Sequence, residues 1–194
     1  MKITPEWLAV TDHCPDGRAF GLSMIPKAGF ELAECWPLIT RPDWIISLAV
    51  KAGALTYERA RFVIVKVLTD HALALDDTAT LGALSDLRES PMTRLSKLRA
   101  IVADGAYVAI AVMKDTDLAH RLNSVGQLIT AEQARSAGHA DVALTRLQGA
   151  AFSLGLSLSH TVASERIKEL MFAFHAQDAR EEKQVQAVRS GVPL

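Results

Sequence analysis

Helix-start signals recur along the whole of this sequence, and they constrain its fold more than any other feature. Thr4 is followed by Pro5, and Ser90 is followed by Pro91. A capping residue with proline behind it is typical of the first turn of a helix, where the N–H that proline lacks would be unpaired anyway. β-Branched residues never accumulate in alternating runs, so the sequence predicts no strand. We therefore expect an all-α fold.

The predicted helices are short in the first third of the chain and become longer and richer in alanine later. After the second start signal, apolar residues follow at helical spacing: Met92, Leu95, Leu98 and Val102. This spacing gives a helix one apolar face to bury. We expect helices over residues 4–10, around 20–24, and over 30–36, 43–52, 56–74, 76–88, from 91, 106–122, from 130 and 162–182.

The length of 194 residues suits one domain or two small ones. All three tryptophans and five of the seven prolines lie before Asp76, which marks a possible subdomain boundary near residue 75. No flexible linker accompanies this change in composition. We therefore predict a single compact multi-helix bundle over residues 1–183, with a polar tail over 184–194 that frays.

The formal net charge of −1 argues against a globally basic nucleic-acid binder and equally against a strongly acidic DNA mimic. Two cysteines in a chain of this size indicate reduced thiols in a cytosol. The N-terminus lacks the apolar segment of a signal peptide, and the longest apolar stretch, residues 107–113, falls far short of the ~20 residues that cross a bilayer. We expect a soluble, cytoplasmic protein with no membrane partner.

Metal-binding residue types are few and poorly spaced. Asp12, His13, Cys14 and Cys35 carry suitable atoms, but no Cys-x-x-Cys or His-x-x-x-His pair is present. Structural zinc sites usually show such spacing. The sequence therefore predicts neither a metal site nor a cofactor.

Motifs for nucleophilic catalysis or phosphate binding are also missing from the sequence. Two polar pairs, Asp70-His71 and Asp76-Asp77, lie around the end of one predicted helix. We interpret His71 as a partner of the last helix carbonyls and the aspartates as caps of the next helix. The sequence thus predicts no catalytic residue, and we expect the protein not to be an enzyme.

Four cations cluster on and beside the helix that starts at Pro91: Arg88, Arg94, Lys97 and Arg99. Arg94 and Lys97 share one helix face. They form either an ordinary solvated face or a docking site for an acidic partner or nucleic acid.

Residues 130–149 fit the spacing of a helix-turn-helix unit. Thr130 and Gln133 match a capping box, and four further residues lie at the expected offsets, namely Ala134, Gly138, Leu144 and Leu147. In that case Arg135, His139 and Arg146 would contact DNA, although His139 stands where an apolar residue usually packs. The alternative is a close helix–helix contact through small residues such as Ala150, Ala151 and Gly155.

Two short motifs in the first third of the chain resemble a known group of proteins. They are Cys14-Pro15-Asp16-Gly17-Arg18-Ala19-Phe20 and Arg41-Pro42-Asp43-Trp44. The pattern Cys-x-x-Gly-x-x-aromatic followed by Arg-x-Asp-Trp is similar to the opening of uncharacterised helical phage and prophage proteins, in which tryptophan is frequent at the position of Phe20. The resemblance covers about residues 7–53. It implies a phage context, in which small proteins often modulate host machinery by binding a protein.

These observations lead to one leading hypothesis and two alternatives. The leading hypothesis is a non-enzymatic, phage-related protein that binds a bacterial host protein or complex and inhibits or modulates a defence system, as anti-CRISPR proteins do. The first alternative is a DNA-binding regulator that uses residues 130–149. The second is an immunity-type protein that neutralises a toxin.

Overall fold

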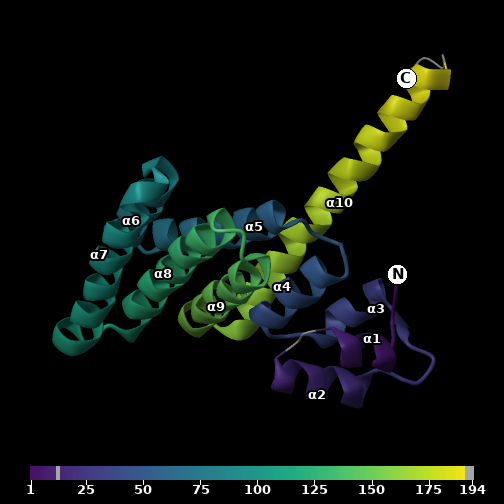
Figure 1. Cartoon of the computed structure of the whole chain (residues 1–194), viewed down its shortest axis with the longest axis horizontal. Helices are drawn as coiled ribbons and strands as arrows, with labels where there is room; N and C mark the ends of the chain where they lie inside the picture. The colour runs from purple at the N-terminus through teal and green to yellow at the C-terminus, as the bar shows by residue number, and fades with distance from the viewer. Residues whose placement is uncertain (12–13, 191–194) are drawn as a thin grey trace.

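A computed structural model of the chain describes residues 1–11 and 14–190. These residues are helical almost throughout, which confirms the all-α prediction (Figure 1). The α-helices are α1 Pro5–Val10, α2 Pro15–Met24, α3 Leu32–Cys35, α4 Pro42–Lys51, α5 Tyr57–Ala74, α6 Thr78–Glu89, α7 Leu95–Val108, α8 Thr116–Ser136, α9 Ala140–Leu158 and α10 His160–Ser190. Shorter elements are the 3₁₀ turns η1 Trp36–Leu38 and η2 Met92–Arg94, the π-helical turn η3 Ala109–Met113, and the strands β1 Lys2–Ile3 and β2 Phe30–Glu31.

Capping side chains explain where several helices begin. The Thr4 hydroxyl accepts a hydrogen bond from the Trp7 N–H at 3.2 Å, and Thr56 caps α5 in the same way. Asp77 caps α6 by accepting from the Thr80 N–H at 3.0 Å. Each cap satisfies an N–H that has no partner within the helix. The predicted starts at these three positions are confirmed.

The helix predicted over residues 30–36 is wrong in its first two residues, as is the prediction of no strand. Phe30 pairs antiparallel with Ile3, so β1 and β2 form a two-residue ladder, and α3 begins only at Leu32. The turn before the ladder depends on Gly29, whose φ is +77°. A Cβ on Gly29 would lie 2.7 Å from the Ile3 carbonyl oxygen, so the ladder forms because this residue has no side chain.

The helix predicted over residues 106–122 is interrupted. After η3, Lys114 adopts the left-handed conformation with a φ of 59°, and Asp115 then caps α8 by accepting from the Leu118 N–H at 2.8 Å. The interruption lets the chain reverse direction between α7 and α8. Because α8 then continues to Ser136, Thr130 lies inside a helix and donates to the Gly126 carbonyl, so the predicted capping box is wrong.

Helices α8 and α9 form the centre of the molecule, with α6 and α7 on one side and α4 and α10 on the other (Figure 1). One apolar cluster of buried residues reaches from Ile3 to Met171. Helix α10 extends beyond this body to Ser190, so residues 184–190 of the predicted frayed tail belong to a helix, whereas 191–194 lie outside the described residues. In the described part of the chain, every helix is too short or too polar to span a membrane.

Candidate functional site: an exposed apolar face on α7

Helix α7 packs on the body through one side only. Leu95, Leu98, Val102 and Ala106 are buried, and they face α6 and α8. The predicted apolar stripe is therefore confirmed for three of its members. Its first member, Met92, instead lies in η2 and is exposed. The rest of α7 is left open at the edge of the molecule.

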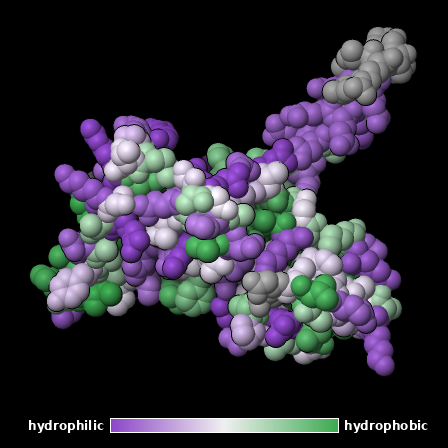
Figure 2. Space-filling view, in the orientation of Figure 1, coloured by the Kyte–Doolittle hydropathy of each residue, from purple (hydrophilic) through white to green (hydrophobic). Residues whose placement is uncertain are grey.

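Large apolar side chains occupy much of this open side and continue into η3. We call them the α7 face, and they are Ile101, Tyr107, Val108, Ile110, Val112 and Met113. Each is between 44% and 71% exposed. Within the described ranges, six of the eighteen exposed large apolar side chains thus come from thirteen consecutive residues, and Figure 2 shows apolar residues gathered over this end of α7. Concentrated exposed apolar surface usually marks an interaction site.

The backbone of η3 holds the second half of the α7 face in place. Ala109 is buried, and its carbonyl accepts from the Asp115 N–H at 2.9 Å, which closes the turn. The Lys114 ammonium donates to the Ala111 carbonyl at 2.9 Å. Isolated π-helical turns are rare and occur frequently at functional sites. Hydrogen bonds thus fix the backbone of this turn, from which Val112 and Met113 are exposed to solvent.

The predicted basic cluster lies beside this apolar surface. Lys97, Ile101 and Val108 are spaced by four and seven residues, so they share one side of α7. The side chains of Arg94, Lys97 and Arg99 are exposed and make no hydrogen bond or ion pair within the described ranges, whereas Arg88 pairs with Glu89 at 3.2 Å. Three of the four predicted cations are therefore available beside the α7 face.

Residues from the two predicted clusters meet in one place. Arg99 of the basic cluster and Arg146 of the predicted helix-turn-helix unit line a groove of about 200 Å³ between α7 and α8. Arg146 lies 3.4 Å from the Gln127 side-chain oxygen within this groove. The groove therefore joins two cations that are far apart in the sequence.

The other two predicted DNA contacts are placed differently. Arg135 pairs with Glu58 of α5, and its guanidinium lies 4.3 Å from the centre of the Tyr57 ring. His139 is exposed at the start of α9 and makes no side-chain cap. Arg135 is thus held against α5.

Helices α8 and α9 run antiparallel in close contact. Ser124 donates to the Ala150 carbonyl at 2.9 Å, and further along the pair Arg121 approaches Ser157 at 3.4 Å. Gly138, with a φ of +82°, turns the chain between them. The two helices of a helix-turn-helix unit cross steeply, whereas this pair is a long helical hairpin with buried Ala150 at its contact. The geometry favours the predicted close helix contact.

A cluster of polar side chains lies at the other end of the same hairpin. His71 Nε2 is 3.2 Å from the Ser157 hydroxyl, so the predicted contact of His71 with the last carbonyls of its own helix is wrong. Burial lowers the pKa of His71, and the Arg121 cation lowers it further. Asp77 and Arg121 complete this cluster through an ion pair at 2.6 Å. The side chains of this cluster interact through hydrogen bonds and an ion pair, and they connect α5, α6, α8 and α9.

The predicted absence of a metal site concerns residues that are only partly described. Among residues 1–11 and 14–190, no three His, Cys, Asp or Glu side chains lie close enough to hold an ion. Asp12 and His13 lie outside the described residues. Cys35 is buried, and this burial together with the nearby Glu34 charge raises its pKa to about 11. The Cys35 thiol is therefore protonated at neutral pH.

The α7 face was not predicted from the sequence. The apolar stretch over residues 107–113 had been interpreted only as too short for a membrane span. The missed signal is that Tyr107 and Val108 lie outside the three-to-four spacing of the buried stripe, so they had no place in the core.

No known protein-family model matches this chain, and neither curated proteins nor solved structures provide a significant match.

Proposed function

We propose that this protein is a non-catalytic binding protein that docks onto another protein through the α7 face. The observation that carries the proposal is the concentration of six exposed apolar side chains on and beyond one edge helix. Protein interfaces combine an apolar centre with a polar rim. Arg94 and Lys97 supply cations at the rim, so the partner presents an apolar surface bordered by acidic residues.

The class of partner follows from the resemblance to phage and prophage proteins. We propose a bacterial host protein complex in the cytoplasm as the target, and inhibition of a defence system, in the manner of anti-CRISPR proteins, as the outcome. The α7 face supports a binding role of this kind because an inhibitor that acts by occlusion needs an exposed contact surface and no catalytic group.

The proposal is tested by expressing the protein in a host with an active CRISPR defence and counting phage plaques. We expect the wild-type protein to raise plaque numbers. Ile101→Asp combined with Val112→Asp places two charges in the α7 face and should abolish the effect. The matched control, Leu73→Asp combined with Val142→Asp, changes two exposed apolar residues on other helices and should leave the effect unchanged.

Two outcomes would contradict the proposal at different levels. If the wild-type protein leaves plaque numbers unchanged, the anti-CRISPR role is rejected. If both double variants act as the wild type does, docking through the α7 face is rejected. Light scattering adds a check, because we expect a monomer; a dimer that Ile101→Asp dissociates would instead assign the α7 face to a second copy of the chain.

A further inference from the structure

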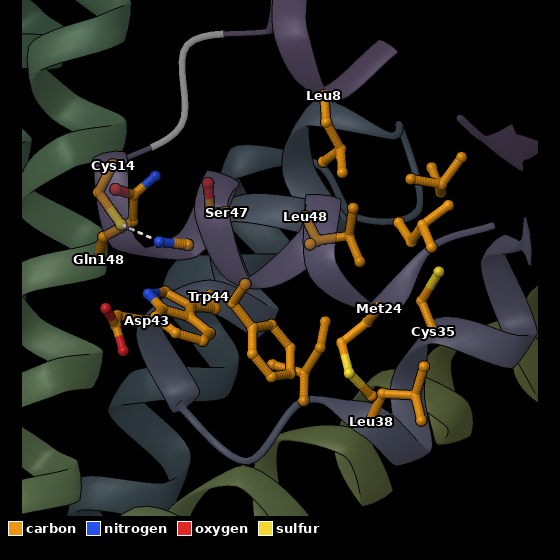
Figure 3. A pocket seen from close by; sticks show the side chains of 16 residues that line it. Leu8, Cys14, Met24, Cys35, Leu38, Asp43, Trp44, Ser47, Leu48 and Gln148 are labelled. Atoms are coloured by element: carbon orange, nitrogen blue, oxygen red, sulfur yellow. Dashed lines mark hydrogen bonds between the residues drawn. The ribbon is translucent and has the colours of Figure 1, made fainter. Parts of the chain in front are cut away.

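A cavity of about 90 Å³ lies between α2 and α4 (Figure 3), and these helices lie on the opposite side of the molecule from α7 (Figure 1). Its walls come from α1, α2, the segment around Cys35, and α4. Most of the wall is apolar and is formed by side chains such as Leu8, Phe20, Met24, Leu38 and Leu48. The cavity therefore offers an apolar molecule a place out of water.

Polar groups gather at one end of this cavity. Cys14, Asp43 and Gln148 lie there beside the indole ring of Trp44, opposite Met24 and Cys35 (Figure 3). The Trp44 Nε1 is buried and donates no hydrogen bond to any residue in the described ranges. A buried indole N–H usually has a partner, because leaving a buried donor unpaired is costly. Trp44 thus supplies an unused donor at the polar end.

Residue 17 is glycine, so its backbone lies beside the indole N–H with no side chain in between. A Cβ on Gly17 would lie 3.1 Å from Cys14 Sγ and 3.2 Å from Trp44 Nε1. Any side chain at this position would crowd the indole N–H from the α2 side. Cys14 itself is exposed, so the polar end of the cavity lies near the surface.

The charges beside the donor favour a neutral ligand. Asp43 is the acidic side chain of the wall, and both of its oxygens accept from Arg41, at 3.2 and 2.8 Å. The Arg41 guanidinium also lies 4.4 Å from the centre of the Trp44 ring. Each charge of this pair is satisfied by the other, so neither requires a charged ligand.

We infer that this cavity binds a compact neutral molecule with an apolar body and one hydrogen-bond acceptor, which pairs with the Trp44 N–H. An enclosed apolar cavity of about 150 Å³ accepts benzene. A smaller space with an open polar end fits a ketone, ester or amide of about four to six non-hydrogen atoms. This inference is independent of docking through the α7 face.

The test follows the indole N–H signals of the full-length protein by ¹H–¹⁵N NMR during titration with cyclopentanone. Trp44→Phe identifies the Trp44 signal by removing it. We expect cyclopentanone at millimolar concentration to shift the Trp44 signal, while the signals of Trp7 and Trp36 serve as internal references. Methylenecyclopentane has the same shape without the acceptor, and we expect it to bind about fivefold more weakly.

Two variants separate a specific hydrogen bond from simple apolar uptake. Gly17→Ala places a methyl group beside the indole N–H and should weaken cyclopentanone binding at least fivefold. Gly82→Ala, in open space on α6, is the matched control and should leave binding unchanged. The inference is overturned if cyclopentanone leaves the Trp44 signal in place, if the two probes bind equally well, or if Gly17→Ala binds as the wild type does.

Discussion

Arg121 Nε donates to Asp77 Oδ2 at 2.6 Å, and the two side chains are only 6% and 5% exposed. Asp77 also accepts from the Thr80 N–H and from the Thr80 hydroxyl, at 3.0 and 2.6 Å. One carboxylate therefore caps α6 and pairs with a cation of α8. Two buried charges are tolerated because each is satisfied by the other and by hydrogen bonds.

Arg121→Met should lower the free energy of unfolding by about 3–5 kcal/mol, because it leaves the Asp77 carboxylate buried without its cation. Urea denaturation at neutral pH measures this change. Lys66→Met is the control: Lys66 pairs with Asp70 on the surface, where the side chains are 46% and 55% exposed. An exposed pair of this kind contributes about 0.3–0.5 kcal/mol. Equal costs for the two variants would contradict a structural role for the buried pair.

The stability of the protein should also fall on mild acidification, because the pKa of His71 is lowered from 6.5 by burial and by the Arg121 cation. The unfolded chain then takes up a proton more readily than the folded chain does. The stabilisation is complete above pH 6.5 and decreases as the pH falls below it, until the folded protein also becomes protonated.

His71→Gln removes this titration and keeps a polar side chain near Ser157. We would measure the free energy of unfolding of both proteins by urea denaturation, from neutral pH down to the titration of Asp77. At lower pH, burial opposes the charged form of Asp77, but hydrogen bonds from Thr80 and Arg121 outweigh it and lower its pKa below 3.8. That second loss should persist in His71→Gln. If the free energy of unfolding changed with pH in the same way in both proteins above the titration of Asp77, the loss assigned to His71 would be refuted.

Local signals in the sequence predicted helices well but predicted their connections poorly. Thr56 and Asp77 cap helices through contacts within one turn, and such contacts are encoded by neighbouring residues. The ladder between Ile3 and Phe30 depends on residues 27 positions apart, and its register is not visible in a periodic pattern. The break at Lys114 precedes Asp115, which caps α8, and the apolar periodicity that predicted one continuous helix carries no sign of this polar cap.

The candidate site was also only partly predictable, because it too depends on the packing of distant segments. Arg94 and Lys97 are apparent as a charge cluster in the sequence. The exposure of Tyr107 and Val112, however, depends on α7 lying at the edge of the molecule, and nothing in the local sequence specifies which helix does so. The partner of Arg121 was likewise hidden, because Asp77 lies 44 positions away.

Truncation of two neighbouring residues on α7 should have very different effects on stability. Ile101 is 58% exposed and Val102 is 3% exposed. Ile101→Ala should change the free energy of unfolding by less than about 0.5 kcal/mol, although it removes the larger side chain. Val102→Ala should cost about 2 kcal/mol because it removes buried methyl groups. Thermal and urea denaturation measure both, and a cost at Ile101 as large as that at Val102 would show that this side chain is covered.

The two cysteines should differ sharply in reactivity. Cys14 is exposed, whereas Cys35 is buried and its pKa is raised to about 11. Only the thiolate reacts quickly with iodoacetamide, so the native protein should be alkylated at Cys14 alone at mildly alkaline pH. Cys14→Ser should then show no rapid alkylation until urea unfolds it. Rapid labelling of native Cys14→Ser would contradict the buried position of Cys35.

Gly155 marks a close approach of α9 to α4 and to the start of α10. A Cβ at this position would lie 2.8 Å from Pro42 Cγ and 2.5 Å from His160 Nδ1. The rigid ring of Pro42 cannot rotate away, so the helices must separate. Gly155→Ala should therefore cost about 1–3 kcal/mol, the usual range for overpacking a core.

Gly82→Ala makes the same chemical change where nothing lies within 4 Å. Alanine is favoured over glycine inside a helix, so this variant should gain about 0.5–1 kcal/mol. Urea denaturation of the two variants compares a packed glycine with an open one in the same fold. If Gly155→Ala were also stabilising, α9 would not be held closely against α4 at Pro42, and the close contact predicted from small residues would fail at this position.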